Sequence, residues 1–507
     1  MTTAAGDMTV GACVRAHATA HGARPAFLTS STTMTWADYH ESADRVSTHL
    51  VDAGVERGDR VAVVMPDGPG VHAAFVGAER IGAVVVGIGF RAGIREIKHL
   101  VVKTGASLLV TEKGSRDELT TELGGIRGLT VPVDVGVLRR RSVSPSGALG
   151  PDDLFLLNST SGTTGLPKCV MHTQRRWFAY HPWAVDAASL TDEEVFFSAI
   201  PTPFGFGLWT AHFTPAILGC PTVLTDRFDA GAALDLIERY RVTVLACVST
   251  QFIMLLNEQQ VRPRDLSSLR CMFTGGEAVP YERAAEFEDR FGATVLQFYG
   301  SNETGALSRT TVSDTRERRL RTAGRVIEDM HVRLFDTDGS DISGRGLPGI
   351  PGCRGPATCL GYYDDDEANR RLVTPDGWML MGDLVEIDEN GYLTVVGRTS
   401  DIIIRGGKNI SAPTVEAEVG THPGVAMVAA VAMPDDVFGE RVCAYVEVRP
   451  GWEGLTLGDL TDHLSSRGVT KEWFPERLIV VDSLPRSSGG KIAKGELRED
   501  VRRRSGR

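Results

Sequence analysis

The chain has 507 residues, more than one hydrophobic core usually supports, so two or more domains are expected. Its 42% apolar and 23% charged residues are ordinary for a globular protein. The net charge of −11 argues against a nucleic-acid-binding protein, which needs a basic surface, and disfavours an anionic membrane surface as the main partner.

No stretch of the sequence predicts export or membrane insertion. Residues 1–7 lack the basic region and the apolar core of a secretory signal. The longest apolar run, residues 81–90, is about half as long as a membrane-spanning helix. The eight cysteines include no Cys-x-x-Cys pair, which argues against a zinc site and a disulfide framework. We therefore expect a reduced, cytoplasmic protein.

Residues 9–110 predict alternating helices and strands. Most of residues 9–50 is expected to be helical, with a short strand inside it, and a further helix is expected at 71–80. The strands expected here are residues 26–28, 58–65, 83–88 and 106–110. Because strand and helix alternate, this part of the chain is predicted to form parallel βαβ units.

The most distinctive stretch is residues 159–168, Ser-Thr-Ser-Gly-Thr-Thr-Gly-Leu-Pro-Lys, which follows a predicted buried strand at 153–158. Glycines let backbone N–H groups turn toward an anion, hydroxyls donate to phosphate oxygens, and Lys168 adds a positive charge. The spacing is not that of a Walker loop, because Leu and Pro separate the last glycine from the lysine. The predicted phosphate-binding residues are Thr160, Ser161, Gly162, Thr163, Thr164, Gly165 and Lys168.

Beyond this loop, the chain continues with strands that lead into turns. The strands expected here are residues 195–200, 242–248 and 269–273, and a fourth that begins at Val295. Between about 321 and 396, short alternating strands with Gly and Asp turns predict an antiparallel or barrel-like subdomain. The sequence therefore predicts a large α/β N-terminal domain, residues 1–398, and a small α+β C-terminal domain, residues 399–507.

Turns after two of these strands carry candidate nucleotide-binding groups. Tyr299, next to Gly300, can offer an aromatic face to a flat base, and the carboxylate of Glu303 can hold Mg²⁺ near phosphates. Residues 275–277, Gly-Gly-Glu, form a second such turn, and Asp383 ends another expected strand. Each turn alone is more typical of an ordinary strand-to-helix connection, but their joint occurrence in this order carries more weight.

Together these motifs resemble those of the adenylate-forming enzymes, which include acyl- and aryl-CoA ligases, adenylation domains of peptide synthetases and luciferases. The resemblance extends from about residue 25 to about 495. Besides the phosphate loop, the matching segments are residues 275–276, 299–303, 378–383, 397–401 and 485–491. The resemblance implies a large N-terminal domain joined to a mobile C-terminal domain by a hinge at Ser400.

The resemblance also implies a role for each matching residue. The residues that would contact adenine and ribose are Gly275, Gly276, Glu277, Tyr299, Gly300, Asn302, Asp383 and Arg398. Lys491 would be the catalytic lysine, and Glu303 a catalytic residue that holds Mg²⁺. Gly406, Gly407 and Lys408 would form the face that admits a thiol. The cofactors would be ATP, Mg²⁺ and coenzyme A.

The implied reaction has two halves. A small-molecule carboxylic acid attacks ATP and gives an acyl-adenylate and pyrophosphate, while the protein aligns the reactants and neutralises phosphate charge. The C-terminal domain then rotates about the hinge, withdraws Lys491 and lets the thiol of CoA, or of an acyl carrier protein, attack the adenylate. The enzyme is expected to be a monomer or a homodimer.

The sequence departs from the family pattern at several positions. Asn302 and Met381 stand where threonines are usual, Cys169 replaces a glycine, and the hinge residue is Ser400 rather than Asp or Lys. Residues 410–416 lack a usual glutamate. An amide at 302 can still donate to phosphate. The departures leave open an enzyme that only transfers a preformed acyl-adenylate, although the retained lysines and glutamate favour the complete reaction.

The predicted acyl pocket contains Phe204, Phe206 and Trp209 and no acidic residue. An α-amino acid is disfavoured, because its buried ammonium would have no partner. Gly205 and Gly207 are predicted to leave room for a bulky ring, although each aromatic residue can equally well fill the core. The pattern favours a hydrophobic carboxylate that is cyclic, aromatic, terpenoid or of medium chain length.

We therefore predict an ATP-dependent acid–CoA ligase, an AMP-forming acyl-CoA synthetase. A stand-alone adenylating enzyme that loads a carrier protein is an alternative with the same fold. A protein that binds nucleotide or acyl-adenylate for regulation, without turnover, belongs to a different class and is disfavoured by the retained lysines and Glu303. A luciferase-type oxygenase is the least favoured.

Overall fold

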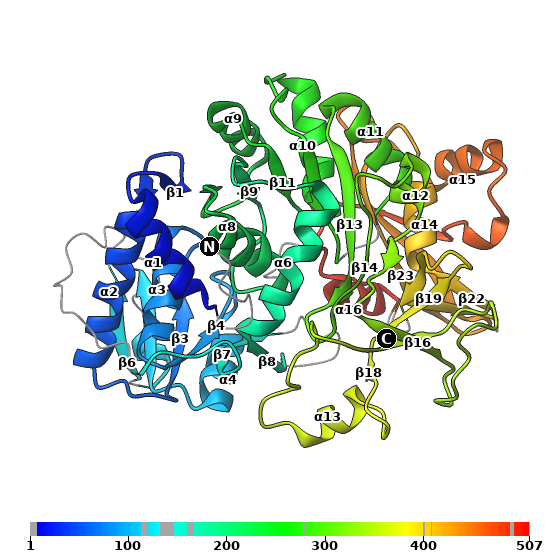
Figure 1. The fold of residues 1–507 in the computed structure, drawn as a ribbon. Helices are drawn as coiled ribbons and strands as arrows, with labels where there is room; N and C mark the ends of the chain where they lie inside the picture. The colour runs from blue at the N-terminus through cyan, green and yellow to red at the C-terminus, as the bar shows by residue number, and fades with distance from the viewer. Residues whose placement is uncertain are drawn as a thin grey trace.

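The structure, a computed structural model, describes residues 8–112, 119–124, 126–131, 147–159, 167–276, 279–398, 401–406, 408–486 and 491–505. It is a mixed α/β protein with two large sheets, two small antiparallel sheets and a separate C-terminal sheet. Figure 1 shows the N-terminal elements on one side of the molecule and the C-terminal elements on the other.

The first large sheet has six strands in the order β6-β5-β3-β4-β7-β8. All neighbours are parallel except β8, which runs antiparallel to β7. Its strands are β3 (Arg60–Val64), β4 (Val84–Gly87), β5 (Leu108–Glu112), β6 (Arg127–Val131), β7 (Leu154–Ser159) and β8 (Cys169–Thr173). The apolar runs of β3 and β4 are buried on both faces, as expected for central parallel strands. The predicted βαβ construction is confirmed.

The second large sheet has nine strands in the order β15-β14-β13-β12-β11-β9-β10-β1-β2. The strands from β13 to β1 are parallel, whereas β2, β14 and β15 are antiparallel edges. They are β1 (Pro25–Leu28), β2 (Thr33–Thr35), β9 (Phe196–Ser198), β10 (Thr222–Val223), β11 (Val244–Ala246), β12 (Cys271–Thr274), β13 (Thr294–Ser301), β14 (Gly305–Arg309) and β15 (Arg325–Val326).

Helices cover these sheets, and their apolar periodicity explains why they do. In α2 (Trp36–Asp52), buried Trp36, Tyr39, Ala43, Val46 and Leu50 recur at helical spacing, and a capping box between Thr35 and Asp38 fixes the start. The other helices of this part are α1 (Val10–His21), α3 (Pro69–Arg80), α4 (Ile94–Thr104), α5 (Leu119–Glu122), α6 (Gln174–Ala188), α7 (Gly205–Gly207), the π-helix η4 (Leu208–Phe213), α8 (Thr214–Leu218), α9 (Ala230–Tyr240), α10 (Ser249–Val261), α11 (Tyr281–Phe291), α12 (Arg316–Arg321) and α13 (Asp366–Leu372).

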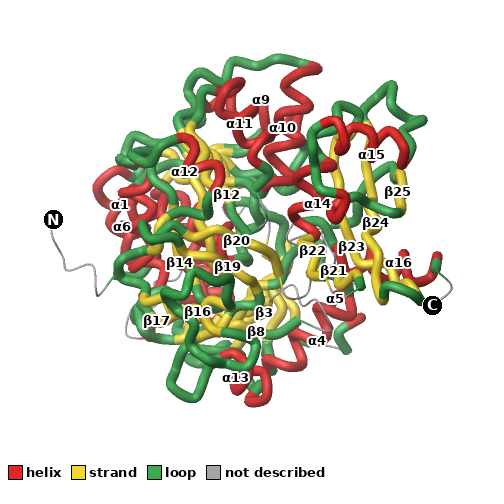
Figure 2. The backbone as a smooth tube through the Cα atoms, turned by 90° about the vertical axis from the view of Figure 1, so that its right-hand side faces the viewer, coloured by secondary structure: helices red, strands yellow, loops and turns green. Residues whose placement is uncertain are grey.

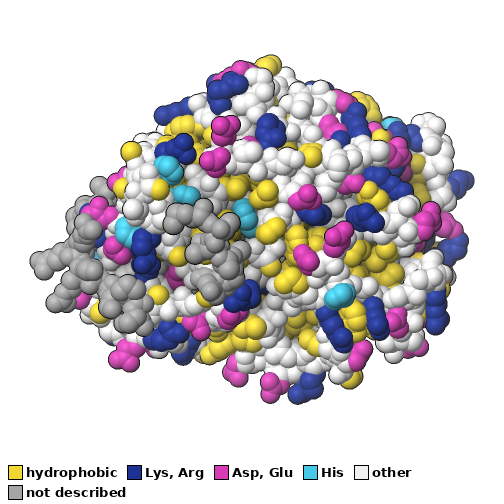
Figure 3. All heavy atoms as spheres, in the orientation of Figure 1, with side chains coloured by type: hydrophobic (Ala, Val, Ile, Leu, Met, Phe, Trp, Pro, Cys, Tyr) yellow, Lys and Arg dark blue, Asp and Glu magenta, His cyan; other side chains and the backbone are white. Residues whose placement is uncertain are grey.

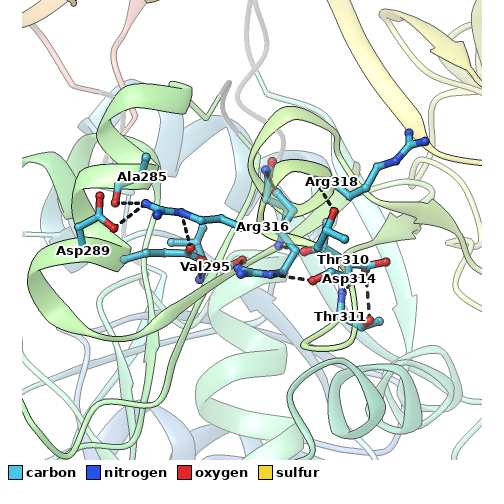
Figure 4. Close-up of polar contacts among 12 residues, drawn as sticks. Ala285, Asp289, Val295, Thr310, Thr311, Asp314, Arg316 and Arg318 are labelled. Atoms are coloured by element: carbon cyan, nitrogen blue, oxygen red, sulfur yellow. Dashed lines mark hydrogen bonds and ion pairs between the residues drawn. The ribbon is translucent and has the colours of Figure 1, made fainter.

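A polar cluster fixes α12 against α11, next to β13. Arg316 forms ion pairs with Glu288 and Asp289 and donates to the carbonyl oxygen of Ala285 (Figure 4). On the far side of α12, the backbone N–H of Thr311 donates to Asp314. Charge-assisted bonds of this kind are stronger than neutral ones. Glu288 also accepts from the backbone N–H of Val295 at 2.8 Å, which holds the start of β13, the strand that leads to the predicted nucleotide-binding turn.

The antiparallel region predicted between about 321 and 396 is present as two small sheets. One contains β16 (His331–Phe335), β17 (Ile350–Arg354) and β18 (Met379–Leu380), and the other contains β19 (Asp383–Ile387) and β20 (Leu393–Arg398). Every pair in them is antiparallel.

The C-terminal sheet has the order β22-β21-β24-β23, with β25 parallel to β24. Its elements are β21 (Ile402–Arg405), β22 (Lys408–Ser411), α14 (Ala412–Val419), β23 (Val425–Asp435), β24 (Gly439–Val448), α15 (Leu457–Ser466), the 3₁₀ turn η5 (Lys471–Trp473), β25 (Arg477–Val480) and α16 (Lys494–Arg504). They group on one side of the molecule in Figure 2. The sheet has a hydrophobic core of its own that includes Ile403, Val415 and Leu460.

The distribution of charge on the surface and the hydrophobicity of the helices are those expected from the composition of a globular protein. In Figure 3, side chains of both charges are interspersed across the visible face. Within the described residues, no helix combines the length and the apolar character needed to cross a bilayer.

A substitution at Gly300 tests how tightly the turn after β13 is packed. A Cβ atom added there would lie 1.8 Å from the carbonyl oxygen of Gly305. We expect Gly300→Ala to lower the free energy of unfolding by about 1–3 kcal/mol, because the backbone must move. Gly495→Ala is the control, since a Cβ atom there meets nothing within 4 Å. Urea unfolding followed by circular dichroism measures both, and equal midpoints would contradict the packing described here.

Candidate active site

The two large sheets meet where β7 and β13 end. Asn158, near the end of β7, and Asn302, in the turn after β13, form a reciprocal amide pair: Asn302 Nδ2 donates to Asn158 Oδ1 at 2.6 Å, and Asn158 Nδ2 donates to Asn302 Oδ1 at 3.2 Å. Carboxyl ends of parallel strands are the usual place for a ligand site in α/β folds. The predicted amide donor of Asn302 is therefore already engaged with another amide.

Glu303 lies beside this pair, and a tyrosine holds its side chain. Tyr362 Oη donates to Glu303 Oε1 at 2.7 Å, and Lys168 Nζ lies 4.7 Å from the centre of the Tyr362 ring. Burial, and then the charge of Glu303, raise the pKa of Tyr362, so its phenol stays protonated and donates. Among the described residues, none donates to Glu303 Oε2. That oxygen is available to a hard cation.

The predicted ribose-binding residues are also brought together. The carboxylate of buried Asp383 accepts a hydrogen bond from Tyr299 Oη at 2.9 Å and one from Arg398 Nε at 2.8 Å. Burial, and then Asp383, raise the pKa of the Tyr299 phenol. Asp383 is therefore held by two donors in one orientation, which suits it to accept hydroxyl hydrogens from a sugar.

Lys491 of the C-terminal domain reaches the glycine turn after β12. Its Nζ donates to the carbonyl oxygen of Gly276 at 2.8 Å. Gly276 has φ +75°, and a Cβ atom there would lie 2.7 Å from Lys491 Nζ. A Cβ atom on Gly275 would lie 2.2 Å from the carbonyl oxygen of Phe298. The two glycines thus bring the backbone and the lysine close together.

The acyl segment, residues 201–209, combines half-buried and buried aromatic side chains. Phe204 and Phe206 are half-buried, whereas Trp209 is buried. Phe206 stacks on Trp209 with ring centres 5.6 Å apart, and Trp209 contacts Tyr180 and Phe298. Trp209 therefore forms a wall behind Phe206.

Gly205 and Gly207 differ in the space beside them. A Cβ atom on Gly205 would meet Asn302 Oδ1 at 3.1 Å and Trp177 at 3.3 Å. A Cβ atom on Gly207 would lie 2.2 Å from the carbonyl oxygen of Pro201. The prediction that Gly207 leaves room for a substrate ring is wrong, because the backbone of the acyl segment itself occupies that space.

A buried chain of hydrogen bonds anchors the acyl segment to the first sheet. Thr202 donates from Oγ1 to Asp67 Oδ1 at 2.5 Å, and its N–H donates to the same oxygen at 3.2 Å. His72 Nε2 lies 3.2 Å from Thr202 Oγ1, and His72 Nδ1 lies 3.0 Å from His212 Nδ1. Because Thr202 uses its hydrogen on Asp67, His72 must donate from Nε2 and accept from His212.

The predicted hinge lies between residues that are anchored to different domains. Arg398 binds Asp383 in the N-terminal domain, whereas Asp401 pairs with Arg498 and Lys494 of α16. A rotation between these anchors breaks none of these ion pairs. Ser400 itself lies outside the described residues.

The predicted thiolation face is part of the C-terminal sheet. Lys408, at the start of β22, pairs with Glu472, and Arg405 pairs with Glu476. Gly406 between them has φ +58°, as a tight turn requires. Both charged side chains are thus held by their own domain while Lys491 contacts the N-terminal domain.

Several predicted site residues lie outside the described residues. They are Thr160, Ser161, Gly162, Thr163, Thr164, Gly165, Glu277, Ser400 and Gly407.

Sequence reasoning missed four residues that contact the predicted ones, directly or, for His172, through Asn158. They are Asn158, His172, Arg176 and Tyr362. Tyr362 follows a glycine next to a second tyrosine, which was a usable signal, but the other three had none. Two residues that depart from the family pattern have contacts within the protein. Cys169 is a buried core residue, and the sulfur of Met381 accepts from Thr304 Oγ1 at 3.6 Å.

Comparison with known proteins decides the family. Residues 14–363 match the family described as AMP-binding enzyme, and residues 414–491 match the AMP-binding enzyme C-terminal domain. The chain belongs to the AMP-binding enzyme family. It is an AMP-forming acid–thiol ligase, and the reaction of this family uses a carboxylic acid, ATP, Mg²⁺ and CoA.

Relatives of this ligase align over nearly its whole length. It is 31% identical to the medium-chain fatty-acid–CoA ligase of Escherichia coli over 490 residues, which covers 93% of this chain and 86% of the relative. It is 32% identical to a feruloyl-CoA synthase of an Amycolatopsis species over 477 residues, with 92% and 94% covered. The crystal structure of the anthranilate CoA ligase AuaEII has the same fold, with a TM-score of 0.90 at 22% identity over 99% of both chains.

The anchor of the acyl segment gives the ligase a testable pH dependence. Burial raises the pKa of the Asp67 carboxyl to about 7, so the folded state keeps a proton that the unfolded chain releases from about pH 4 upward. This carboxyl therefore lowers stability as the pH rises from about 4 to 7, and adds no further slope above that range.

Asp67→Asn should remove this part of the pH dependence, because the amide oxygen still accepts from Thr202 but does not titrate. We expect the variant to gain about 4 kcal/mol over the wild type between pH 4 and pH 8, because a pKa raised from about 4 to about 7 is worth about 1.4 kcal/mol per pH unit of that interval. Urea unfolding at a series of pH values measures it. Parallel stability curves for the two proteins would show that Asp67 does not carry the raised pKa.

Proposed function

We propose that this ligase activates an aromatic or similarly bulky hydrophobic carboxylic acid and transfers it to CoA. The observation that carries the substrate class is the acyl segment: Phe204 and Phe206 are half-buried, Trp209 stands behind them, and Trp177 borders Gly205. Flat aromatic walls favour a flat ring. One relative is a feruloyl-CoA synthase, which supports an aromatic substrate.

We assign the first half-reaction to residues of both domains. The carboxylate attacks the α-phosphate of ATP while Lys491 and Lys168 neutralise the charge of the phosphates. Asp383 and Arg398 hold the ribose, and Tyr299 offers its ring to the adenine. The carbonyl oxygen of Gly276, which accepts from Lys491 at 2.8 Å, holds the lysine at the edge of the site until a phosphate oxygen replaces that contact.

The residues present fit a magnesium ion at Glu303. Tyr362 donates to one carboxylate oxygen of Glu303, and the other oxygen receives no hydrogen bond from a described residue. Tyr362 therefore orients the carboxylate, while the second oxygen remains available to bind the ion. Mg²⁺ binds one or two carboxylates together with substrate phosphates. When bound, the ion would neutralise phosphate charge at Glu303.

The second half-reaction fits a rotation at the hinge. We assign the domain boundary to residues 398–399, because Arg398 is anchored to Asp383 and Asp401 to α16. Rotation would withdraw Lys491 and bring Gly406, Gly407 and Lys408 to the site. The contact of Lys491 with Gly276 supports a protein that performs adenylation as well as thiolation.

We also propose that the ligase acts in the cytoplasm. All eight cysteines are free and buried. Burial raises the pKa of several of them, Cys271 for example to about 12, so these thiols are unreactive core side chains.

Lys491→Ala tests the proposed division of labour between the domains. The variant should lose adenylation about 100- to 1000-fold, because a charge that stabilises the transition state is removed. It should still convert a supplied acyl-adenylate and CoA into acyl-CoA within about threefold of the wild type. Pyrophosphate exchange measures the first half-reaction, and mass spectrometry of acyl-CoA the second.

The matched control is Arg502→Ala, which removes an exposed cation from the same domain. It should change neither rate. If Lys491→Ala formed acyl-adenylate as fast as the wild type, Lys491 would not be the catalytic lysine.

A further inference from the structure

The side chain of Asn158 uses its full hydrogen-bonding capacity inside the protein. Its Nδ2 donates to the carbonyl oxygen of Pro203 at 2.9 Å and to Asn302 Oδ1 at 3.2 Å. Its Oδ1 accepts from Asn302 Nδ2 at 2.6 Å and from His172 Nε2 at 2.7 Å. A primary amide has two donor hydrogens and two acceptor lone pairs, and all four are used. Such a side chain has one possible orientation.

His172 connects this amide to a buried arginine. Arg176 Nη1 lies 2.6 Å from His172 Nδ1, and because arginine only donates, Nδ1 is the acceptor and Nε2 carries the hydrogen that Asn158 receives. Burial, and then the charge of Arg176, lower the pKa of His172 well below its usual value, so the ring is neutral and this tautomer is fixed. His172 and Arg176 stand one turn apart, at the end of β8 and the start of α6.

Arg176 also fixes the backbone next to Glu303. Its Nη1 donates to the carbonyl oxygen of Asn302 at 3.0 Å, which belongs to the peptide group that joins Asn302 to Glu303. The guanidinium is buried, and among the described residues no carboxylate lies within ion-pair distance of it. The charge of Glu303 nevertheless acts on Arg176 through space. A buried cation without a paired carboxylate is costly for stability, and its position beside the Glu303 turn is consistent with a role in the site.

The network therefore joins three parts of the site. Asn158 is the residue before the last of β7, the strand that leads into the phosphate loop. Pro203 belongs to the acyl segment, and Asn302 precedes the glutamate that we assign to Mg²⁺. A shift of any one part strains the hydrogen bonds to the other two, because Asn158 has no spare donor or acceptor.

We propose that Asn158 and Arg176 are positioning residues for adenylation, which hold the acyl segment and the Glu303 turn in one arrangement. The bound acid is thereby aligned with the phosphates held at Glu303. This inference rests on the proposed role of Glu303. It also assigns a purpose to the departure at position 302: the asparagine provides the amide that pairs with Asn158, which a threonine side chain lacks.

Three variants test the amide pair: Asn158→Ala, Asn302→Ala and the double variant. Each single variant should slow adenylation about 10- to 100-fold and raise the Mg²⁺ concentration for half-maximal rate several-fold, because a buried amide loses its partner and Glu303 loses its fixed position. The double variant should be no slower than the slower single variant.

A second comparison tests Arg176 directly. Arg176→Met should raise the Mg²⁺ requirement as the asparagine variants do, and Arg176→Lys should recover part of the loss, because lysine restores the charge without the planar donor group. Calorimetric titration of ATP with and without Mg²⁺ gives a readout besides turnover. The wild type should gain affinity with Mg²⁺, and Arg176→Met should lose most of that gain.

Gln297→Met is the matched control. Gln297 is a buried amide on β13 that donates to the carbonyl oxygen of Arg319 at 2.6 Å, away from the acyl segment. It should lower stability without changing the Mg²⁺ requirement, as a merely structural amide does. The inference would be overturned if the double variant lost as much adenylation free energy as the two single variants added together. It would also be overturned if Asn158→Ala and Arg176→Met left the Mg²⁺ requirement unchanged.

The test separates this inference from the proposed function. A wild-type protein that gains no ATP affinity from Mg²⁺ would contradict the role of Glu303 and with it the inference. A wild type that gains affinity and forms acyl-adenylate, with variants that behave like Gln297→Met, would leave the proposed function intact and overturn the inference alone.

Discussion

The contact between Lys491 and Gly276 is the interaction on which the arrangement of the site depends. It places a cation from the C-terminal domain at a turn of the N-terminal domain. When a carboxylate attacks the α-phosphate of ATP, two negatively charged groups approach each other. An enzyme that catalyses this reaction therefore needs positive charge close to the reacting atoms. Because this lysine belongs to the C-terminal domain, the rotation that we propose would remove that charge once the first half-reaction is complete. The hinge and its two sets of anchoring ion pairs follow from this requirement.

The N-terminal domain solves a different problem, which is to hold an apolar acid next to a highly charged nucleotide. The acyl segment presents aromatic rings, and the adjoining turns present Glu303, Asp383 and Lys168. The backbone N–H of Thr202 donates to Asp67, and Asn158 donates to the carbonyl oxygen of Pro203, so both contacts fix the backbone of the acyl segment. Because Asn158 also pairs with Asn302, its hydrogen bonds connect the acyl segment to the turn that carries Glu303.

The sequence predicted the elements better than it predicted the contacts. The expected strand at 153–158 differs from β7 by one residue at each end. Runs of apolar residues and turn residues are local, so they are visible in a sequence. The partners Glu303 and Tyr362 are 59 residues apart, and Asn158 and Asn302 are 144 apart. No local pattern joins them, and only the folded chain shows that the unusual asparagine at 302 has an amide partner. The room expected at Gly207 was wrong because the carbonyl oxygen of Pro201 turns back onto that glycine, and the sequence does not show how the backbone turns.

The most direct test uses purified protein, Mg-ATP and a panel of aromatic, cyclic and medium-chain acids, with and without CoA. AMP, acyl-adenylate and acyl-CoA are followed by mass spectrometry. The account predicts acyl-adenylate without CoA from an aromatic acid, and its conversion into acyl-CoA and AMP when CoA is added. Acyl-CoA formed only from a synthetic acyl-adenylate, with no adenylate from any free acid, would contradict the assignment of Lys491 and Glu303 to adenylation.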